Sequence, residues 1–180
     1  MKCLITGGTG FIGSSFIKYN AGNKNSFLIL SRNTGANNSD NKIIQNLNAI
    51  SDNEKIDCII NLAGQPIDIR WTNKNKKELI ESRVKISELL VGLVKRLKVK
   101  PKVVLSASAI GFYGNKKGTL DEKSNGQASF TRSLCKQWES AILKAKKYEV
   151  RVSILRFGLV LGKNQGFLKK VLLPFVLGLG

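Results

Sequence analysis

The residues with the clearest chemical pattern open the chain, where Thr6 to Gly13 read Thr-Gly-Gly-Thr-Gly-Phe-Ile-Gly. They follow a short apolar run of strand length and precede apolar residues at helical spacing, such as Phe16 and Ile17. A strand that turns through glycines into a helix is the phosphate-cradling unit of a dinucleotide-binding βαβ fold. An ordinary glycine-rich turn between a strand and a helix is the alternative, which the position of the motif disfavours.

Each glycine of this motif has its own expected role. The first glycines permit the tight turn, Gly10 lets the backbone approach a pyrophosphate, and Gly13 lets the helix pack closely against the strand. The helix starts next to them, and its free N–H groups would face the phosphates. We therefore predict a cofactor-binding turn made of Gly7, Gly10, Phe11, Ile12 and Gly13.

A second candidate pair, Ser31 and Arg32, lies where the next predicted strand ends, about 24 residues after Gly7. An acidic residue near this point would accept a hydrogen bond from the ribose 2′-hydroxyl of NAD, whereas an arginine accommodates the 2′-phosphate of NADP. Serine removes the repulsive carboxylate, and arginine supplies charge-assisted hydrogen bonds. The pair favours NADP over NAD, and the alternative is a surface arginine in a loop.

Composition sets the size and the charge of the molecule. With 180 residues, 42% of them hydrophobic, the chain is long enough for one domain with a core. Lys and Arg number 30 against 12 Asp and Glu, a net charge of +18. Such a charge is compatible with nucleic-acid binding, but the lysines are scattered and accompanied by abundant Asn and Ile. We interpret them as a solvated surface whose field would also favour an anionic cofactor.

Cysteine and histidine usage excludes several kinds of site. The three cysteines are an odd number without paired spacing, so reduced core thiols are expected rather than disulfides or a metal site. Histidine is absent, which excludes His-based triads and most zinc sites. The chain enters its first strand without a signal sequence, and no run approaches the roughly 20 apolar residues of a membrane span. We expect a cytoplasmic protein, or an organellar one that has lost a leader; its oligomeric state is left open.

Alternating strand and helix patterns predict the fold class. Helices are expected near 11–22, 75–97 and 131–147, and strands near 3–5, 26–30, 43–47, 58–62, 103–106 and 152–155. Residues 33–41 are too polar and glycine-bearing for a full crossover helix. Continuous apolar strands that alternate with helices imply an α/β fold, a doubly wound parallel sheet (Rossmann-like) covered on both faces. No repeat or internal boundary divides it, so a single domain is expected.

Several stretches together resemble the extended short-chain dehydrogenase/reductase superfamily, of the NAD-dependent epimerase/dehydratase type, and within it the YfcH-type epimerase family. They occur in family order along the whole chain and are specific in combination. The matching stretches are Thr6–Gly13, Ser31-Arg32, Asn61–Gly64, Arg70-Trp71, Glu81–Arg83, Gly111–Gly114, Trp138-Glu139, Leu155-Arg156 and Leu173–Gly180.

The resemblance implies further cofactor contacts. The turn of Leu62, Ala63 and Gly64 would lie against the cofactor at the carboxyl edge of the sheet. On the helix that follows, Arg83 would pair with a phosphate and Glu78 would bond a hydroxyl, while Val160 would contribute through its backbone. Without the family, an ordinary charged helix face explains Glu78 and Arg83 equally well.

The catalytic residues of the superfamily are not all present. Related dehydrogenases combine a serine or threonine with a Tyr-x-x-x-Lys pair, whose positions, counted back from Glu139, fall on Thr131 and Cys135. Threonine is a poor acid or base at neutral pH, and a thiol cannot replace an ammonium. The resemblance places Ser108 at the superfamily serine, with Tyr113 as the nearby phenol. We predict both as substrate-side groups; a loop serine and a packed aromatic are the alternatives.

The resemblance also implies that relatives continue beyond the Leu-Gly-Leu-Gly segment. We therefore expect an NADP-binding domain at 1–165 and, at 166–180, the start of a truncated substrate region. The leading interpretation is an NADP-dependent epimerase or oxidoreductase with an unidentified small-molecule substrate. A non-catalytic NADP(H) sensor or an inactive fragment is the alternative, and a nucleic-acid-binding module is disfavoured.

Overall fold

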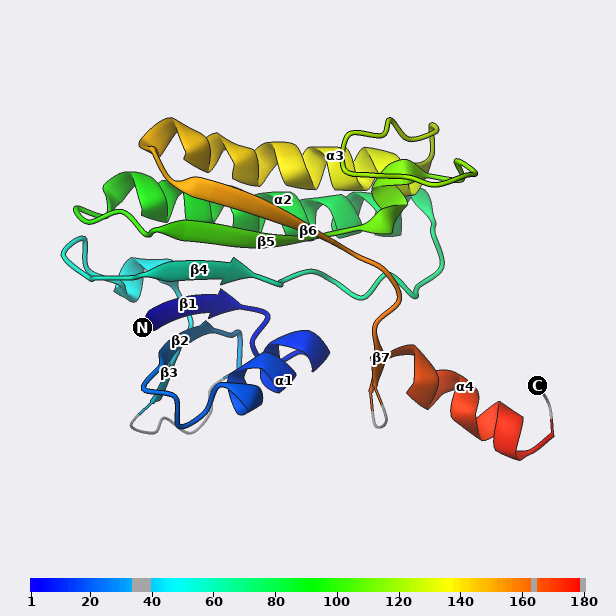
Figure 1. Cartoon of the computed structure of the whole chain (residues 1–180), viewed down its shortest axis with the longest axis horizontal. Helices are drawn as coiled ribbons and strands as arrows, with labels where there is room; N and C mark the ends of the chain where they lie inside the picture. The colour runs from blue at the N-terminus through cyan, green and yellow to red at the C-terminus, as the bar shows by residue number, and fades with distance from the viewer. Residues whose placement is uncertain (34–39, 163–164, 179–180) are drawn as a thin grey trace.

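The computed structural model describes residues 1–33, 40–162 and 165–178, which contain one six-stranded sheet (Figure 1). The strands pair in parallel in the order β3-β2-β1-β4-β5-β6. Because the order reverses between β1 and β4, the loops that leave these two strands diverge and open a crevice at the carboxyl edge. The bounds are β1 Lys2–Thr6, β2 Ser26–Leu30, β3 Asn41–Ile44, β4 Cys58–Asn61, β5 Val103–Ala109 and β6 Arg151–Phe157.

Helices cover both faces of this sheet. The helix α1 (Phe11–Tyr19) packs on one face, whereas α2 (Asn73–Arg96) and α3 (Phe130–Leu143) lie side by side on the other (Figure 1). The predicted doubly wound, Rossmann-like fold is therefore confirmed. Short elements complete it: η1 Leu47–Ala49, η2 Ile110–Tyr113, η3 Lys144–Tyr148, β7 Leu161–Gly162 and α4 Gly166–Val176. None of the helices in the described ranges is long and apolar enough to cross a bilayer.

Several predicted boundaries differ from the structure; β5, for example, continues to Ala109 and not only to residue 106. The third strand was expected to reach Leu47, but Leu47 begins η1, where the Asn46 side chain accepts a hydrogen bond from the Asn48 N–H. The first helix ends at Tyr19, because Asn20 caps it, and not at residue 22. The helix expected to reach residue 147 is α-helical to Leu143 and continues as the tighter turn η3. Most of the 33–41 segment, residues 34–39, lies outside the described residues.

The core lies on both faces of the central strands. On the α2 side, Leu4, Ile59 and Val104 pack in one cluster with Leu90 and Leu93 of α2. On the α1 side, successive residues of the same strands form a second cluster that includes Cys3, Ile5 and Ile60. Burying each large apolar side chain contributes about 1.5–3 kcal/mol, which explains why β1 and β4 are apolar without alternation.

Two glycines of the opening motif have no room for a side chain. Gly7 has a φ of +70°, and a Cβ atom there would lie 2.7 Å from the carbonyl carbon of Leu62. A Cβ atom at Gly13 would lie 2.4 Å from the carbonyl oxygen of Gly7. At Gly10, by contrast, it would meet only the Gly7 oxygen, at 3.2 Å. The close packing at Gly7 and Gly13 positions the start of α1 at the crevice between β1 and β4.

Candidate functional site

A cleft of about 770 Å³ lies at the crevice where the strand order reverses. It is formed by the residues that follow β1, β2, β3 and β4, together with Ser82 and Ile86 of α2. Seven of the residues predicted to bind a cofactor line it: Gly7, Gly10, Ser31, Arg32, Leu62, Ala63 and Gly64. The sequence interpretation did not include the other residues that line it: Thr6, Thr9, Leu30, Asn33, Gln45, Gln65, Pro66, Ser82 and Ile86.

Buried polar side chains tie the strand ends together beneath this cleft. The Thr6 hydroxyl donates to Asn61 Oδ1 at 2.7 Å, and Asn61 Nδ2 donates to the hydroxyls of Ser87 (3.3 Å) and Ser106 (3.2 Å). The Ala63 N–H donates to Thr6 Oγ1 at 3.3 Å, which fixes the first residues of the β4–α2 loop. Thr6, Asn61, Ser87 and Ser106 are fully buried, so their mutual hydrogen bonds offset the cost of desolvation.

The start of α1 presents backbone groups to the cleft. Its N-cap, Gly10, is extended and has no side chain that could accept a hydrogen bond from the first turn. The first N–H groups of a helix have no intrahelical acceptor, so they are available to an anion. The Phe11 ring instead lies against Gly162 of β7 and Gly166 of α4, where built Cβ atoms would be 2.3 Å and 2.9 Å from it. Any contribution of Phe11 to the cleft would therefore come from its backbone.

Ser31 and Arg32 follow β2 and line the same cleft. The Ser31 N–H donates to the Ile44 carbonyl, and its hydroxyl accepts a hydrogen bond from the Asn33 N–H at 3.2 Å. Arg32 is exposed, and no carboxylate in the described part of the chain forms an ion pair with its guanidinium. The cleft therefore holds a cation that an anionic ligand can neutralise.

Arg83 lies beneath the cleft rather than along it. Its guanidinium donates to the carbonyls of Leu79 (3.0 Å) and Gln65 (2.9 Å) and stacks 5.1 Å from the Trp138 ring centroid. A Cβ atom at Gly64 would lie 3.0 Å from the guanidinium carbon. Burial lowers the pKa of Arg83. In this structure the guanidinium supports the β4–α2 loop, and the phosphate contact implied by the resemblance stays a prediction.

The remaining predicted cofactor contacts also lie off the lining of the cleft. Glu78 is half-buried on α2, one turn before Ser82, which does line it. Val160 is half-buried between β6 and β7, and Ile12 and Gly13 lie within α1. The contacts of Ile12, Gly13 and Val160 would be made by backbone groups and that of Glu78 by its carboxylate, and all four stay predictions.

The two predicted substrate-side groups are connected through an ion pair between the buried Glu139 carboxylate and the partly buried Arg156 guanidinium. The Ser108 hydroxyl donates to Glu139 Oε1 at 2.6 Å, and the Arg156 guanidinium donates to both Glu139 oxygens at 2.9 Å. Arg156 Nη1 also donates to the Tyr113 hydroxyl at 3.0 Å. Ser108 is 3% exposed and Glu139 6%. The hydrogen bonds to Glu139 raise the pKa of Arg156, so the guanidinium stays charged.

This network determines whether Ser108 and Tyr113 can donate or accept a further hydrogen bond. Ser108 gives its one proton to Glu139 and can offer only lone pairs to another group. Tyr113 accepts from Arg156 and keeps its proton for donation. The sequence interpretation noted Glu139 and Arg156 in matching stretches but not their pairing, which joins residues 17 apart on different elements.

The positions of the superfamily tyrosine and lysine hold no acid–base pair. Cys135 is buried, its thiol lies 3.7 Å from the Ala109 carbonyl oxygen, and burial raises its pKa. The Thr131 hydroxyl lies 3.0 Å from the Ser129 hydroxyl. Across residues 1–33, 40–162 and 165–178, no three His, Cys, Asp or Glu side chains gather as metal ligands.

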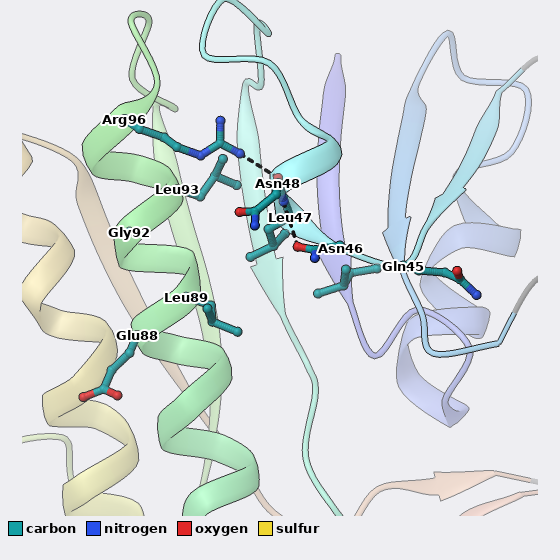
Figure 2. A pocket seen from close by; sticks show the side chains of 10 residues that line it. Gln45, Asn46, Leu47, Asn48, Glu88, Leu89, Gly92, Leu93 and Arg96 are labelled. Carbon is teal, nitrogen blue, oxygen red and sulfur yellow. Dashed lines mark hydrogen bonds between the residues drawn. The ribbon is translucent and has the colours of Figure 1, made fainter.

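A second cleft of about 550 Å³ adjoins the first, between η1 and α2 (Figure 2). The two share Leu30 and Gln45. Amide side chains line its η1 side, while Glu88 and Leu89 line the α2 side (Figure 2). Arg96 closes one end by donating to the Leu47 carbonyl at 2.6 Å. Amides both donate and accept, so this extension suits a neutral polar ring better than a phosphate.

Comparison with models of known protein families shows to which family the chain belongs. The model of the NAD dependent epimerase/dehydratase family matches residues 3–178. The chain belongs to this family. Like its members, it is a Rossmann-like protein of the short-chain dehydrogenase/reductase type.

Relatives of this family member come from plants and bacteria. An Arabidopsis thaliana protein named epimerase family protein SDR39U1 homolog, chloroplastic, is 32% identical over 97% of this chain and 53% of its own length. Epimerase family protein YfhF of Bacillus subtilis is 31% identical over 97% of this chain and 60% of its own length. The chain thus spans a little over half the length of these relatives.

Two solved structures share the fold and part of the sequence. Human epimerase family protein SDR39U1 (isoform 2), crystallised with NADPH, superposes with a TM-score of 0.86 at 29% identity and covers 100% of this chain. This chain covers 61% of that protein. A nucleoside-diphosphate sugar epimerase from Corynebacterium glutamicum has a TM-score of 0.79 at 27% identity. The superposition covers 97% of this chain and 37% of the Corynebacterium chain.

Proposed function

We propose that this chain binds NADP(H) in the cleft at the strand reversal and belongs to the YfcH type within its family. The observation that carries the proposal is the placement of Ser31 and Arg32 in the same cleft as the glycine turn. The sequence directly after β2, residues 31–39, contains no Asp or Glu that would repel a 2′-phosphate, and Arg32 is exposed there. The NADPH bound by the human relative supports the same choice, so NAD is the less favoured cofactor.

Different parts of the cleft suit different parts of this dinucleotide. The N–H groups at the start of α1, from Phe11 to Gly13, would hold the pyrophosphate. Ser31 and Arg32 would bind the 2′-phosphate by charge-assisted hydrogen bonds. The amides around Gln45 would accommodate the adenine, and Leu62 to Gly64 would contact the remainder of the cofactor.

We propose that the complete protein is an epimerase or oxidoreductase acting on an unidentified small molecule. The cofactor would supply a hydride acceptor or donor. In this chain, Tyr113 would donate a proton to a substrate oxygen, and Ser108 would accept a hydrogen bond from the substrate. Arg156 and Glu139 would hold the two groups in these orientations.

A non-catalytic NADP(H)-binding protein is the second candidate. It is favoured by Thr131 and Cys135, which stand where related dehydrogenases have tyrosine and lysine. A screen of NADPH oxidation against aldehydes, ketones and nucleotide sugars separates the two. Turnover that Tyr113→Phe abolishes supports the enzyme, whereas NADPH binding without turnover of any compound supports the sensor.

We propose further that residues 1–165 form the cofactor domain and residues 166–180 begin a substrate region. The exposed apolar side chains of α4 support this division. A reducing compartment such as the cytoplasm is also proposed, because all three cysteines are free and buried.

Isothermal titration calorimetry with NADPH and NADH tests the cofactor proposal. We expect tighter binding of NADPH, and a loss of about 1.5–3 kcal/mol of its binding energy in Arg32→Ala, which removes a charge-assisted contact. Binding of NADH should hardly change. Arg151→Ala, an exposed arginine on β6, is the matched control. Equal affinities of the unmodified protein for both cofactors would refute the assignment.

A further inference from the structure

The cations of this chain are dense at the amino edge of the sheet, where the parallel strands begin. The segments 95–102 and 144–151 contain nine Lys or Arg residues and a single acidic residue, Glu149. Over the whole chain, 30 such cations accompany 12 acidic residues. The two segments therefore hold a local excess of positive charge that the average composition does not explain.

Pairing of β5 with β6 brings these two segments together. Val103, which follows the first segment, pairs with Arg151, the last residue of the second. Neighbouring strands are about 4.8 Å apart, so the two segments reach the sheet side by side. Lys100 Nζ also lies 5.9 Å from the centre of the Tyr148 ring. Figure 1 shows this edge at the left end of the molecule, where α2 and α3 end and β5 and β6 begin.

Main-chain hydrogen bonds fix a third loop, which precedes β4, against the first segment. The Lys98 N–H donates to the Asp52 carbonyl at 2.8 Å. The Lys102 N–H donates to the Asp57 carbonyl at 2.9 Å. The Asp57 carboxylate accepts a hydrogen bond from the Lys2 N–H at 2.8 Å. The loops of this edge are therefore held in place before a partner binds, which lowers the entropy cost of binding.

Three of the nine cations have partners within the protein. Arg96 forms an ion pair with Asp52. Lys144 Nζ lies 3.4 Å from Glu88 Oε1, and Lys100 Nζ donates to three carbonyls at the end of α2. The other six are exposed, and none of them forms an ion pair with a carboxylate among the residues that the structure describes: Lys95, Lys98, Lys102, Lys146, Lys147 and Arg151.

The residues of this edge suit lipid headgroups better than nucleic acid. Tyr148, the single aromatic residue of the two segments, is half-buried, so it offers no open stacking platform for bases. Five of the six free cations are lysines, which lack the bidentate geometry with which arginine reads bases. Val99 is 51% exposed and lies between two lysines in the sequence. Clusters of about four to eight Lys or Arg residues are typical of anionic-lipid binding, and an exposed apolar residue adds a hydrophobic contact.

We propose that the amino edge docks on an anionic lipid bilayer, with Val99 entering the headgroup layer and the six free cations facing the lipid phosphates and carboxylates. The cofactor cleft lies at the opposite, carboxyl edge of the same strands, so a docked molecule presents the cleft to the aqueous side. The inference is independent of the proposed function, because the docking does not require a bound cofactor.

Flotation of vesicles on a density gradient tests the docking, because protein that only self-associates does not float. Vesicles of phosphatidylcholine alone are compared with vesicles that contain equal parts of phosphatidylcholine and phosphatidylserine. We expect the unmodified protein to float with the anionic vesicles only at about 0.1 M salt, and to be released at about 1 M, where screening acts within about 3 Å. Flotation with neither kind of vesicle, or equally with both, overturns the proposal.

Matched charge variants separate this edge from the net charge of the molecule. Each lysine near an anionic bilayer contributes about fivefold to partitioning, so Lys98→Gln/Lys102→Gln should weaken it about thirtyfold. Lys116→Gln/Lys117→Gln removes the same charge from exposed lysines beyond the carboxyl edge and should change it far less. Urea midpoints establish that both variants are folded. Equal losses in the two double variants would show that only the net charge attracts the protein, and the proposal would fail.

Val99 distinguishes a bilayer from a nucleic acid. One methylene buried in lipid changes partitioning by up to about fourfold, so Val99→Leu should strengthen vesicle binding and Val99→Asn should weaken it. Binding of a labelled DNA duplex through its phosphates should be insensitive to both changes. The lipid assignment is overturned if both variants bind vesicles like the unmodified protein, or if the duplex binds through Lys98 and Lys102 while the vesicles do not.

The exposed apolar helix α4 provides the last control. Leu172→Asn/Phe175→Asn removes apolar surface at the other end of the molecule and should float like the unmodified protein. If this variant loses flotation while Lys98→Gln/Lys102→Gln retains it, α4 binds the vesicles and the amino edge does not.

Discussion

At the scale of single residues, the Glu139 carboxylate shows why a charge can remain in the interior. Three donors surround it: the Ser108 hydroxyl and two nitrogens of Arg156. The Arg156 guanidinium in turn lies 3.5 Å from the centre of the Phe112 ring. A buried carboxylate without such partners would be strongly destabilising, so each donor is needed by the fold independently of any chemistry at Tyr113.

Removing the guanidinium tests this ion pair. Arg156→Gln should lower the free energy of unfolding by about 3 kcal/mol, because it leaves the Glu139 charge buried without its cation. Arg156→Lys should cost less, since it keeps the charge but loses the paired hydrogen bonds. Urea denaturation measures both, with Arg151→Gln on the same strand as control. A loss in Arg156→Gln no larger than in the control would contradict the interpretation.

Cys135 leads to a pH-dependent prediction. Burial raises its pKa above the ordinary value of 9.0, so folding favours the protonated thiol. In the unfolded chain the thiol ionises as the pH rises above that value, whereas in the folded protein it stays protonated. Ionisation therefore stabilises the unfolded state and lowers the free energy of unfolding. The urea midpoint should therefore fall between pH 8 and pH 10 by more in the unmodified protein than in Cys135→Ala. An equal fall in both proteins would show that the thiol does not contribute.

At the scale of elements, apolar patterning was sufficient for most of the sheet. The second strand is confirmed at Ser26–Leu30, and β1 and β4 were recognisable because parallel strands buried on both faces must be continuously apolar. The same pattern failed at Leu47, where the Asn46 side chain accepts a hydrogen bond from the Asn48 N–H and stabilises a short turn instead of a longer strand. A local hydrogen bond of this kind leaves no periodic pattern in the sequence, so apolar patterning could not predict it.

The cleft was predictable only in part for a related reason. Gly7, Ser31 and Leu62 were recognised because each ends a strand, and parallel strands bring their carboxyl ends to one edge. The network from Thr6 through Asn61 to Ser106 was missed, since it joins residues 55 and 45 positions apart. For Arg83 the sequence allowed either a phosphate contact or an ordinary charged helix face. Its burial under the β4–α2 loop and against Trp138 depends on packing that leaves no pattern in the sequence.

The glycine turn gives a prediction that separates folding from binding. Gly10→Val should remain folded, because a Cβ atom there meets only one oxygen, at 3.2 Å. It should lose NADP(H) binding, since its side chain occupies the approach of the pyrophosphate. Gly13→Val should instead destabilise the fold, because its Cβ atom would lie 2.4 Å from the Gly7 oxygen. Circular dichroism and calorimetry measure the two effects, and normal binding by folded Gly10→Val would exclude this loop as the phosphate site.

At the scale of the whole molecule, two features act against each other. The helix α4 exposes apolar side chains over much of its length, among them Phe167, Leu172, Phe175 and Val176. Exposed apolar surface of this kind favours self-association. The net charge of +18 opposes it, since two copies repel each other strongly at low ionic strength.

We therefore predict that self-association of this chain increases with salt. Screening shortens the range of the repulsion to about 10 Å at 0.1 M salt and about 3 Å at 1 M, while the apolar attraction of α4 persists. Light scattering across this range should show a rising mean mass. The double variant Leu172→Asn/Phe175→Asn should suppress the rise, whereas Tyr19→Asn, which removes an exposed aromatic from α1, should not. A mass that is independent of salt, or a rise that the double variant retains, would show that α4 is not the associating surface.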